Sequence, residues 1–277
     1  MLASESRARA RTSRLVLLIA RGVQTLYPLL ALAILVLAWE ATVRVRETPE
    51  YVLPAPSAIG SEIYEQRALL LQHSWVTLIE ILLGFALSIA VALPLSVLIV
   101  YSRFFERVFY PLLVSSQTIP KVAIAPLLVF WFGLGVLPKV LVAFLVAFFP
   151  LVISSVIGMR ATPPEMIYLV RSMGAGTIRT FVNARFPNAL PSIFGGLKVA
   201  ITLCVIGAIV GEFVGASEGL GYLVVVAQGN LQSRLIFASI TMMAIIGIVL
   251  FYVVEIIERL VISWHVSAQD ERVAMTP

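Results

Sequence analysis

The sequence predicts an all-α polytopic membrane protein with six transmembrane helices. Hydrophobic residues make up 60% of its 277 residues and charged residues only 13%, whereas a soluble domain carries about a quarter charged residues. The mean hydropathy is +1.00. The apolar runs are continuous and near the length of a helical span, and they lack the alternating segments of about ten residues that form membrane β-barrels.

The first predicted span covers residues 22–43 and follows a basic tail at residues 1–21. Five arginines precede the span: Arg7, Arg9, Arg11, Arg14 and Arg21. A secretory signal peptide is the alternative, because Ala31-Leu-Ala33 resembles a cleavage site. That triplet lies inside the apolar run, so we expect a retained span.

Residues 44–75 are more polar and are rich in proline. We expect Ser57 to cap a short helix that lies at the outer interface of the membrane. A core at residues 76–264 then supplies five more spans, predicted at 76–101, 108–132, 137–158, 193–214 and 235–264. Residues 265–277 form a second tail.

Basic residues are distributed unevenly between the two sides of the predicted membrane topology. Fourteen Lys and Arg residues fall on the two tails, the 101–107 loop and the polar segment 160–191 with its exit. The positive-inside rule therefore places both termini and segment 160–191 in the cytosol, in a cell or inner membrane. The net charge of +5 follows from this bias. Nucleic acid is not an expected partner, because no basic soluble domain is present.

Segment 160–191 is predicted to form two short helices separated by a glycine break. In the first helix Thr162 can cap, Pro163 suits the first position, and Glu165 can bond back to the cap backbone. Residues Met166, Leu169, Val170 and Met173 form an apolar stripe at helical spacing, and Tyr168 and Arg171 lie away from it. Gly174 ends this helix. The second helix, at 177–185, is expected to stop at Pro187 and Pro191.

Two interpretations of the apolar stripe remain open on pattern alone. The stripe can rest on lipid headgroups, or it can dock into the groove of a soluble partner. Its short length and the flexible methionines at both ends favour docking.

Charged residues inside the predicted spans are candidates for a translocation pathway or gate. Lys121 is ten residues or more into its span and is flanked by Pro120 and Pro126, so we place it near mid-membrane. It can line a path for an electron-rich solute or form a structural ion pair. Glu212 can guard the outer mouth, or it can pair with Lys139 or with a basic partner protein.

Several motifs together resemble the permeases of type I ABC importers. They are Leu53-Pro-Ala-Pro-Ser57, Ile119-Pro-Lys-Val-Ala-Ile-Ala-Pro126, Trp131-Phe-Gly133, Ala189-Leu-Pro-Ser192, Gly211-Glu-Phe-Val-Gly-Ala-Ser-Glu-Gly-Leu-Gly-Tyr222 and Glu258-Arg259. They cover roughly residues 50–265 and resemble the nitrate, taurine, aliphatic sulfonate and thiamine-pyrimidine-precursor branch. Segment 160–191 is similar to the coupling loop of that family. Gly174 matches its glycine, whereas Tyr168-Leu169-Val170 replaces the usual Glu-Ala-Ala.

The resemblance implies a MetI-like transmembrane domain and a permease subunit without an ATPase site. It implies two ABC ATPase subunits, a second permease copy that we expect to be identical, and a periplasmic or lipid-anchored solute-binding protein. The solute would be a nitrate-, sulfonate- or taurine-like anion or a pyrimidine vitamin precursor. An autonomous ion-coupled transporter or channel is the alternative, and a membrane enzyme is a third hypothesis.

No cofactor or metal is expected on this chain, and ATP with Mg²⁺ would bind the partner subunits. The sequence has no phosphate-binding loop of the Walker type. His73 and His265 are far apart, and we expect both near span ends. Cys204, the single cysteine, is expected to pack as an apolar group.

Overall fold

The computed structural model describes Tyr27 and residues 30–262, and every regular element in this part of the chain is helical. The two predicted tails, His265 and the first residues of span 22–43 lie outside the described residues. A helix covers residues 30–45. The elements that follow are α2 (Pro56–Glu65), α3 (Arg67–Tyr101), α4 (Arg103–Ser116), η1 (Lys121–Ile124), α5 (Ala125–Phe132), α6 (Val136–Arg160), α7 (Pro164–Ser172), α8 (Thr177–Thr180), η2 (Phe181–Arg185), α9 (Phe186–Gly215), α10 (Leu220–Gly229) and α11 (Ser233–Val261).

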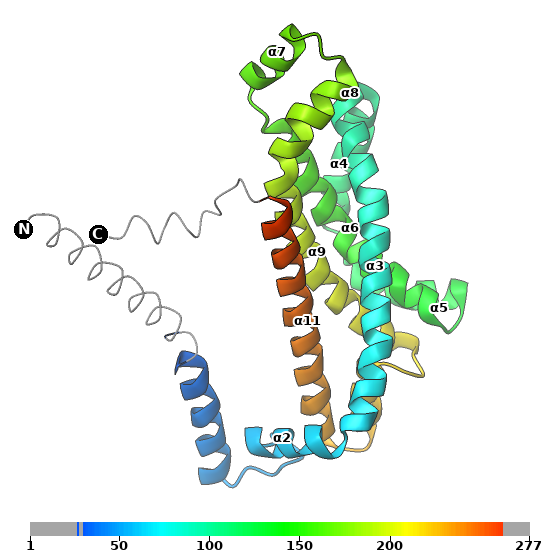
Figure 1. The fold of residues 1–277 in the computed structure, drawn as a ribbon. Helices are drawn as coiled ribbons and strands as arrows, with labels where there is room; N and C mark the ends of the chain where they lie inside the picture. Colours follow the sequence, from blue (N-terminus) through cyan, green and yellow to red (C-terminus); the bar gives the residue numbers. More distant parts are fainter. Residues whose placement is uncertain (1–26, 28–29, 263–277) are drawn as a thin grey trace, which may run out of the picture.

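Four helices in the described part are long and apolar enough to cross a membrane. They are α3, α6, the 39-residue stretch Thr177–Gly215 and α11, and they confirm the helices predicted around 76–101, 137–158, 193–214 and 235–264. The long helices run alongside one another (Figure 1).

The span predicted at 108–132 is sharply bent in the structure. The chain there forms α4 and then η1 with α5, and the two parts meet at 90°. Pro120 supplies a physical reason, because proline has no N–H for a helical bond and disfavours helical geometry in the preceding residue. The structure thus has a broken span where the sequence predicted a continuous one.

Helices α6 and α9 form the centre of the bundle by close backbone contact. A Cβ added at Gly207 would lie 2.6 Å from Cα of Ala143, and one added at Gly158 would lie 2.6 Å from Cβ of Ser192. Residue 143 of α6 thus contacts residue 207 of α9, and the later residue 158 contacts the earlier residue 192. The two helices are therefore antiparallel. Gly207 permits this close approach because it has no side chain.

The two ends of the bundle carry different elements (Figure 1). Helix α7 projects from one end, and α2 lies across the other. Arg160 at the end of α6 pairs with Glu106 of α4 at 2.8 Å, which confirms that the 101–107 loop and segment 160–191 share one end.

Two helix boundaries differ from the sequence prediction. Ser57 is not the cap of α2: Ala55 precedes the helix, and the Ser57 backbone N–H and hydroxyl donate to the Glu40 carboxylate at 3.0 and 2.8 Å. Pro187 and Pro191 do not stop the second short helix, because α8, η2 and α9 run on as one helix. Pro187 directly follows η2, a π-helical turn in which the backbone hydrogen-bond register shifts, so the continuous helix accommodates it.

Candidate functional site

Helix α7 carries the apolar stripe on the outside of the molecule. None of its nine residues is buried. Met166 is 42% exposed, Leu169 62% and Met173 80%, and Tyr168 is exposed as well. Val170 is half-buried. The structure therefore brings the predicted stripe together on a projecting helix, with its largest side chains accessible to a partner.

The end of α7 is fixed by backbone geometry. Gly174 has φ +84, a conformation that favours glycine. Its N–H donates to the carbonyl of Arg171 at 2.9 Å, and the N–H of Ala175 donates to the carbonyl of Val170 at 3.3 Å. This confirms Gly174 as the residue at which the helix stops.

The beginning of α7 differs from the predicted capping box. No side chain caps the helix, so neither Thr162 nor Glu165 has the predicted capping role. Thr162 is buried; its hydroxyl donates to the carbonyl of Met159 at 3.2 Å and accepts from Nδ2 of Asn188 at 3.4 Å. Thr162 thus ties the end of α6 to α9.

The base of the projection is an aromatic cluster. The ring of Phe181 lies 5.9 Å from that of Tyr101 and 5.7 Å from that of Phe186, and the Arg185 guanidinium lies 5.1 Å above the Tyr101 ring. The residues after α7 therefore rest on the end of α3 and run on into α9. A force on α7 would reach the central helix of the bundle through the short turn at residues 173–176.

Lys121 lies at the break between α4 and α5. Its Nζ is 4.7 Å from the centroid of the Phe149 ring, and Phe149 is near the middle of α6. Among the described residues of this chain no carboxylate pairs with Lys121, so no interhelix ion pair forms there; a pair with a second subunit stays a prediction. Pro120 is exposed beside it. Lys121 and the irregular backbone around it therefore lie at the level of the middle of α6.

A buried polar cluster lies at the end of the bundle opposite α7. Lys139 of α6 donates to Oε1 of Glu80 on α3 at 2.5 Å. The hydrogen-bonded partner of Lys139 is therefore Glu80, and the alternative that Lys139 pairs with Glu212 is wrong. Sequence reasoning missed this pair, although two opposite charges inside neighbouring apolar runs were a signal for it.

Glu212 holds the turn between α9 and α10. Its Oε1 lies 2.6 Å from the Thr77 hydroxyl, and its Oε2 accepts from the Gly221 N–H. A Cβ added at Gly219, which has φ +116, would lie 2.2 Å from Oε1 of Glu212. Only glycine fits against this carboxyl group, which places Glu212 inside the protein and not at an open mouth.

His73 completes the attachment of the turn. Its Nδ1 accepts from the Gly219 N–H at 2.9 Å, and the Leu220 N–H donates to the Thr77 hydroxyl at 2.9 Å. The His73 ring also stacks on Tyr222 at 6.0 Å. His73 therefore lies near the beginning of α3, at a span end as expected, but it is buried in a protein contact.

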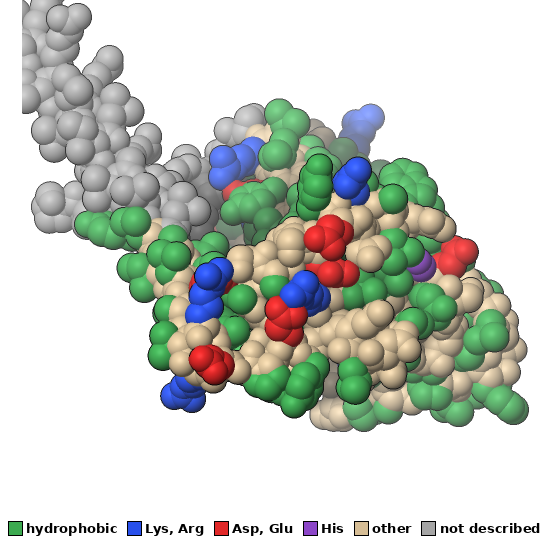
Figure 2. All heavy atoms as spheres, turned by 90° about the horizontal axis from the view of Figure 1, so that it is seen from below, with side chains coloured by type: hydrophobic (Ala, Val, Ile, Leu, Met, Phe, Trp, Pro, Cys, Tyr) green, Lys and Arg blue, Asp and Glu red, His purple; other side chains and the backbone are tan. Residues whose placement is uncertain are grey.

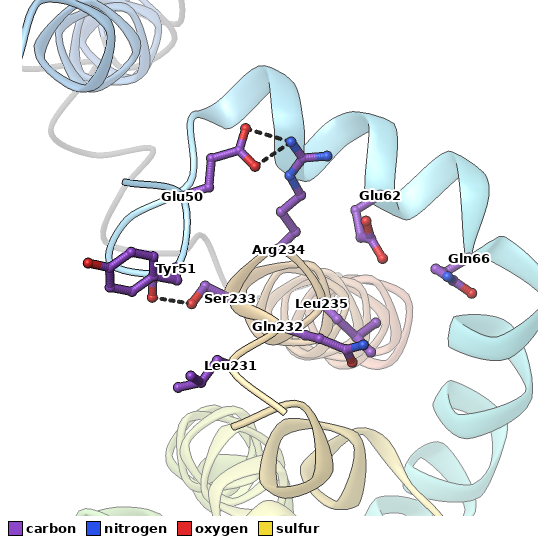
Figure 3. Close-up of a pocket in the computed structure, with 9 residues that line it drawn as sticks. All are labelled: Glu50, Tyr51, Glu62, Gln66, Leu231, Gln232, Ser233, Arg234 and Leu235. Atoms are coloured by element: carbon purple, nitrogen blue, oxygen red, sulfur yellow. Dashed lines mark hydrogen bonds and ion pairs between the residues drawn. The ribbon is translucent and has the colours of Figure 1, made fainter. Parts of the chain in front are cut away.

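A polar pocket of about 390 Å³ opens between α2 and the start of α11 (Figure 3). The Arg234 guanidinium pairs with the Glu50 carboxylate, and the Ser233 hydroxyl donates to the Tyr51 carbonyl at 2.5 Å. Glu62 of α2 also lines the pocket. Figure 2 shows acidic and basic side chains side by side on this end of the molecule. The sequence did not reveal the pocket, because Glu50 and Arg234 are 184 residues apart.

Comparison with known proteins identifies the family. The family model described as "binding-protein-dependent transport system inner membrane component" matches residues 83–264. The formylaminopyrimidine transport permease protein ThiX of Halalkalibacterium halodurans is 37% identical over 246 residues, which cover 88% of this chain and 98% of the relative. The riboflavin transport system permease protein RibX of Chloroflexus aurantiacus is 36% identical, over 85% of this chain and 89% of the relative.

A solved structure shares the fold. The inward-facing MetNI methionine ABC transporter contains a chain that superposes with a TM-score of 0.59 at 18% identity, over 72% of this chain and 97% of that chain. The matched family model covers most of the described bundle, including the broken span and the projecting α7. The chain therefore belongs to the binding-protein-dependent transport system inner membrane components, and it is a permease subunit of an ABC importer.

Proposed function

We propose that two copies of this chain form the membrane pathway of an importer, with one ATPase subunit docked on the α7 projection of each copy. The projection carries this proposal: its apolar side chains are exposed, and only the short turn at residues 173–176 separates it from the helix Thr177–Gly215, which includes α9. ATP and Mg²⁺ bind the partner subunits, and this chain contributes no cofactor and no ATPase site. Closure of the ATPases would move the two projections and thereby the two bundles.

The proposed orientation places the α7 end and both termini in the cytosol. The bias of basic residues toward this end supports the proposal. The opposite end, with α2 and the pocket beside Arg234, then faces the solute-binding protein. Charged side chains on that surface suit an electrostatic encounter with a soluble partner.

The proposed solute is a small nitrogen heterocycle of the pyrimidine-precursor class. Support comes from two relatives at 36–37% identity whose names specify formylaminopyrimidine and riboflavin transport. Relatives named for aliphatic sulfonates are 28% identical, so a sulfonate is the second candidate. In both cases Lys121, beside Pro120 at the break, would offer a positive charge to electron-rich oxygen or nitrogen atoms of the solute.

Reconstitution tests this function directly. The permease, its ATPase and its solute-binding protein are placed in proteoliposomes, and uptake of labelled formylaminopyrimidine and of a sulfonate is measured. We expect uptake to require ATP and all three proteins. Uptake by the permease alone, driven by an ion gradient, would instead support an autonomous transporter, a class in which broken helices also occur.

Replacement of Lys121 is expected to reduce transport. A hydrogen bond to a charged group contributes about 1.5–3 kcal/mol, so Lys121→Met should lower the uptake rate at low solute concentration by roughly tenfold or more. Lys121→Arg keeps the charge and should retain most of the uptake. The measurement is initial uptake rate in the reconstituted system. Normal transport with unchanged solute affinity in Lys121→Met would exclude Lys121 from the pathway.

A further inference from the structure

Two carboxyl groups and one ammonium group are buried together where α3, α6 and α9 meet. Glu80 is 0% exposed, Glu212 1% and Lys139 4%. The charges of all three groups interact. If all were ionised, one negative charge would remain uncompensated in a closed site. Burial of an unpaired ion costs several kcal/mol, so charge balance favours one bound proton.

The hydrogen bonds around Thr77 indicate which carboxyl group carries this proton. The Thr77 hydroxyl has one proton to donate and two lone pairs to accept with. It has three neighbours: the Leu220 N–H at 2.9 Å, Oε1 of Glu212 at 2.6 Å and the carbonyl of His73 at 3.2 Å. If Glu212 is protonated, its hydroxyl donates to Thr77, and Thr77 donates to His73. All three contacts are then satisfied at once.

The second carboxyl oxygen of Glu212 fits the same assignment. Oε2 accepts from the Gly221 N–H, as the carbonyl oxygen of a neutral acid does. If Glu212 were ionised, Thr77 would have to donate to it, and the contact from Thr77 to His73 would lose its proton. The hydrogen-bond pattern is therefore complete only with a neutral Glu212.

Glu80 is the less suitable carrier of the proton. Its Oε1 lies 2.5 Å from Nζ of Lys139, the geometry of an ion pair. Its Oε2 is buried and makes no hydrogen bond of ordinary geometry among the described residues, and the neighbouring side chain there is that of Glu212 itself. Glu80 and Lys139 then form a neutral pair.

The remaining titratable neighbours do not alter this balance. Nδ1 of His73 accepts a hydrogen bond from Gly219, so that nitrogen carries no proton in this arrangement. Glu218 approaches His73 but is exposed, and Tyr222 stacks on the His73 ring. Within the part of the chain that the structure describes, Lys139 is the one charged group that α6 brings to the cluster.

We propose that Glu80, Lys139 and Glu212 form a proton-binding site that holds one proton, on Glu212, in the folded permease at neutral pH. The site is electrically neutral, and the protonated Glu212 fastens the turn before α10 to α3. Nothing in this proposal depends on the identity of the solute or on the docking of ATPase subunits.

Infrared difference spectroscopy of the full chain in lipid tests the proposal. A protonated carboxyl group has a carbonyl stretching band that an ionised one lacks. We expect one such band from this site in the wild type. Either Glu80→Gln or Glu212→Gln should remove it, because the remaining carboxylate then balances Lys139. Lys139→Met should give two bands, because both carboxyl groups become neutral.

A change at Thr77 assigns the proton to one residue. Thr77→Val removes the acceptor of the proposed Glu212 hydroxyl, so the band should move to the frequency of a weaker hydrogen bond. An unchanged band in Thr77→Val would overturn the assignment to Glu212. Absence of any band that responds to Glu80→Gln and Glu212→Gln would show that the site holds no proton.

The exposed Glu218 supplies the matched control, because Glu218→Gln should leave the band unchanged. Each variant is also checked for its melting temperature. If Lys139→Met does not fold, the two nearly isosteric glutamine variants and Thr77→Val still decide the question.

Discussion

Glutamate at Met166, Leu169 and Met173 is expected to release the ATPase subunits and to abolish solute uptake. Full burial of an apolar side chain of this size contributes about 1.5–3 kcal/mol, so even one lost anchor weakens docking by roughly tenfold. All three side chains are exposed in the chain alone. The membrane helices should therefore remain folded. Copurification of the ATPase and ATP-dependent uptake are the measurements.

The matched control is a glutamate at the other end of the molecule. Val45 follows the predicted first span and is 82% exposed, so Val45→Glu introduces one exposed glutamate away from the projection, a control for each single member of the triple substitution. It should retain both the ATPase and uptake. An intact, fully active importer with the triple substitution would show that α7 is not the docking element.

Replacement by alanine should lower the free energy of unfolding at Gly207 of α9 but not at Gly195 of the same helix. A Cβ at Gly207 would lie 2.6 Å from Cα of Ala143, whereas one at Gly195 meets nothing within 4 Å. The Ala143 backbone cannot turn away, so Gly207→Ala must separate α6 from α9. We expect a loss of about 1–3 kcal/mol in the free energy of unfolding.

Gly195→Ala should be neutral or stabilising by up to about 1 kcal/mol, because alanine favours a helix over glycine. Melting temperatures of the two purified variants in the same detergent give the comparison. Equal losses at both positions would mean that the separation of α6 and α9 is not what limits stability.

Hydropathy was sufficient to locate α3, α6 and α11, because a bilayer-length apolar run has few other ways to satisfy its backbone. The break at Pro120 could not be predicted in the same way. Proline also occurs inside intact helices here, at Pro94 and Pro150. Whether proline breaks a membrane helix depends on neighbours that can satisfy the freed backbone groups, and these neighbours are known only from the fold.

In the candidate site, too, local features could be predicted from the sequence and contacts between distant segments could not. The exposed stripe of α7 follows from helical spacing and from the left-handed turn at Gly174, both of which are local. The pairing of Lys139 with Glu80, and the use of Ser57 to bind Glu40, depend on which distant segments meet. Sequence reasoning named Lys139 and Ser57 but could not assign their partners.

The uninterrupted path of Thr177–Gly215 has a mechanical consequence. Thirty-nine residues at 1.5 Å per residue give a stiff rod about 58 Å long. If it pivots near its middle, against α6, a tilt of about ten degrees swings each tip by roughly 5 Å in opposite directions, by the same helix geometry. Such a tilt of one rigid helix would open the pathway on one side of the membrane as it closes the other side. No second element would be needed to transmit the motion between the two sides.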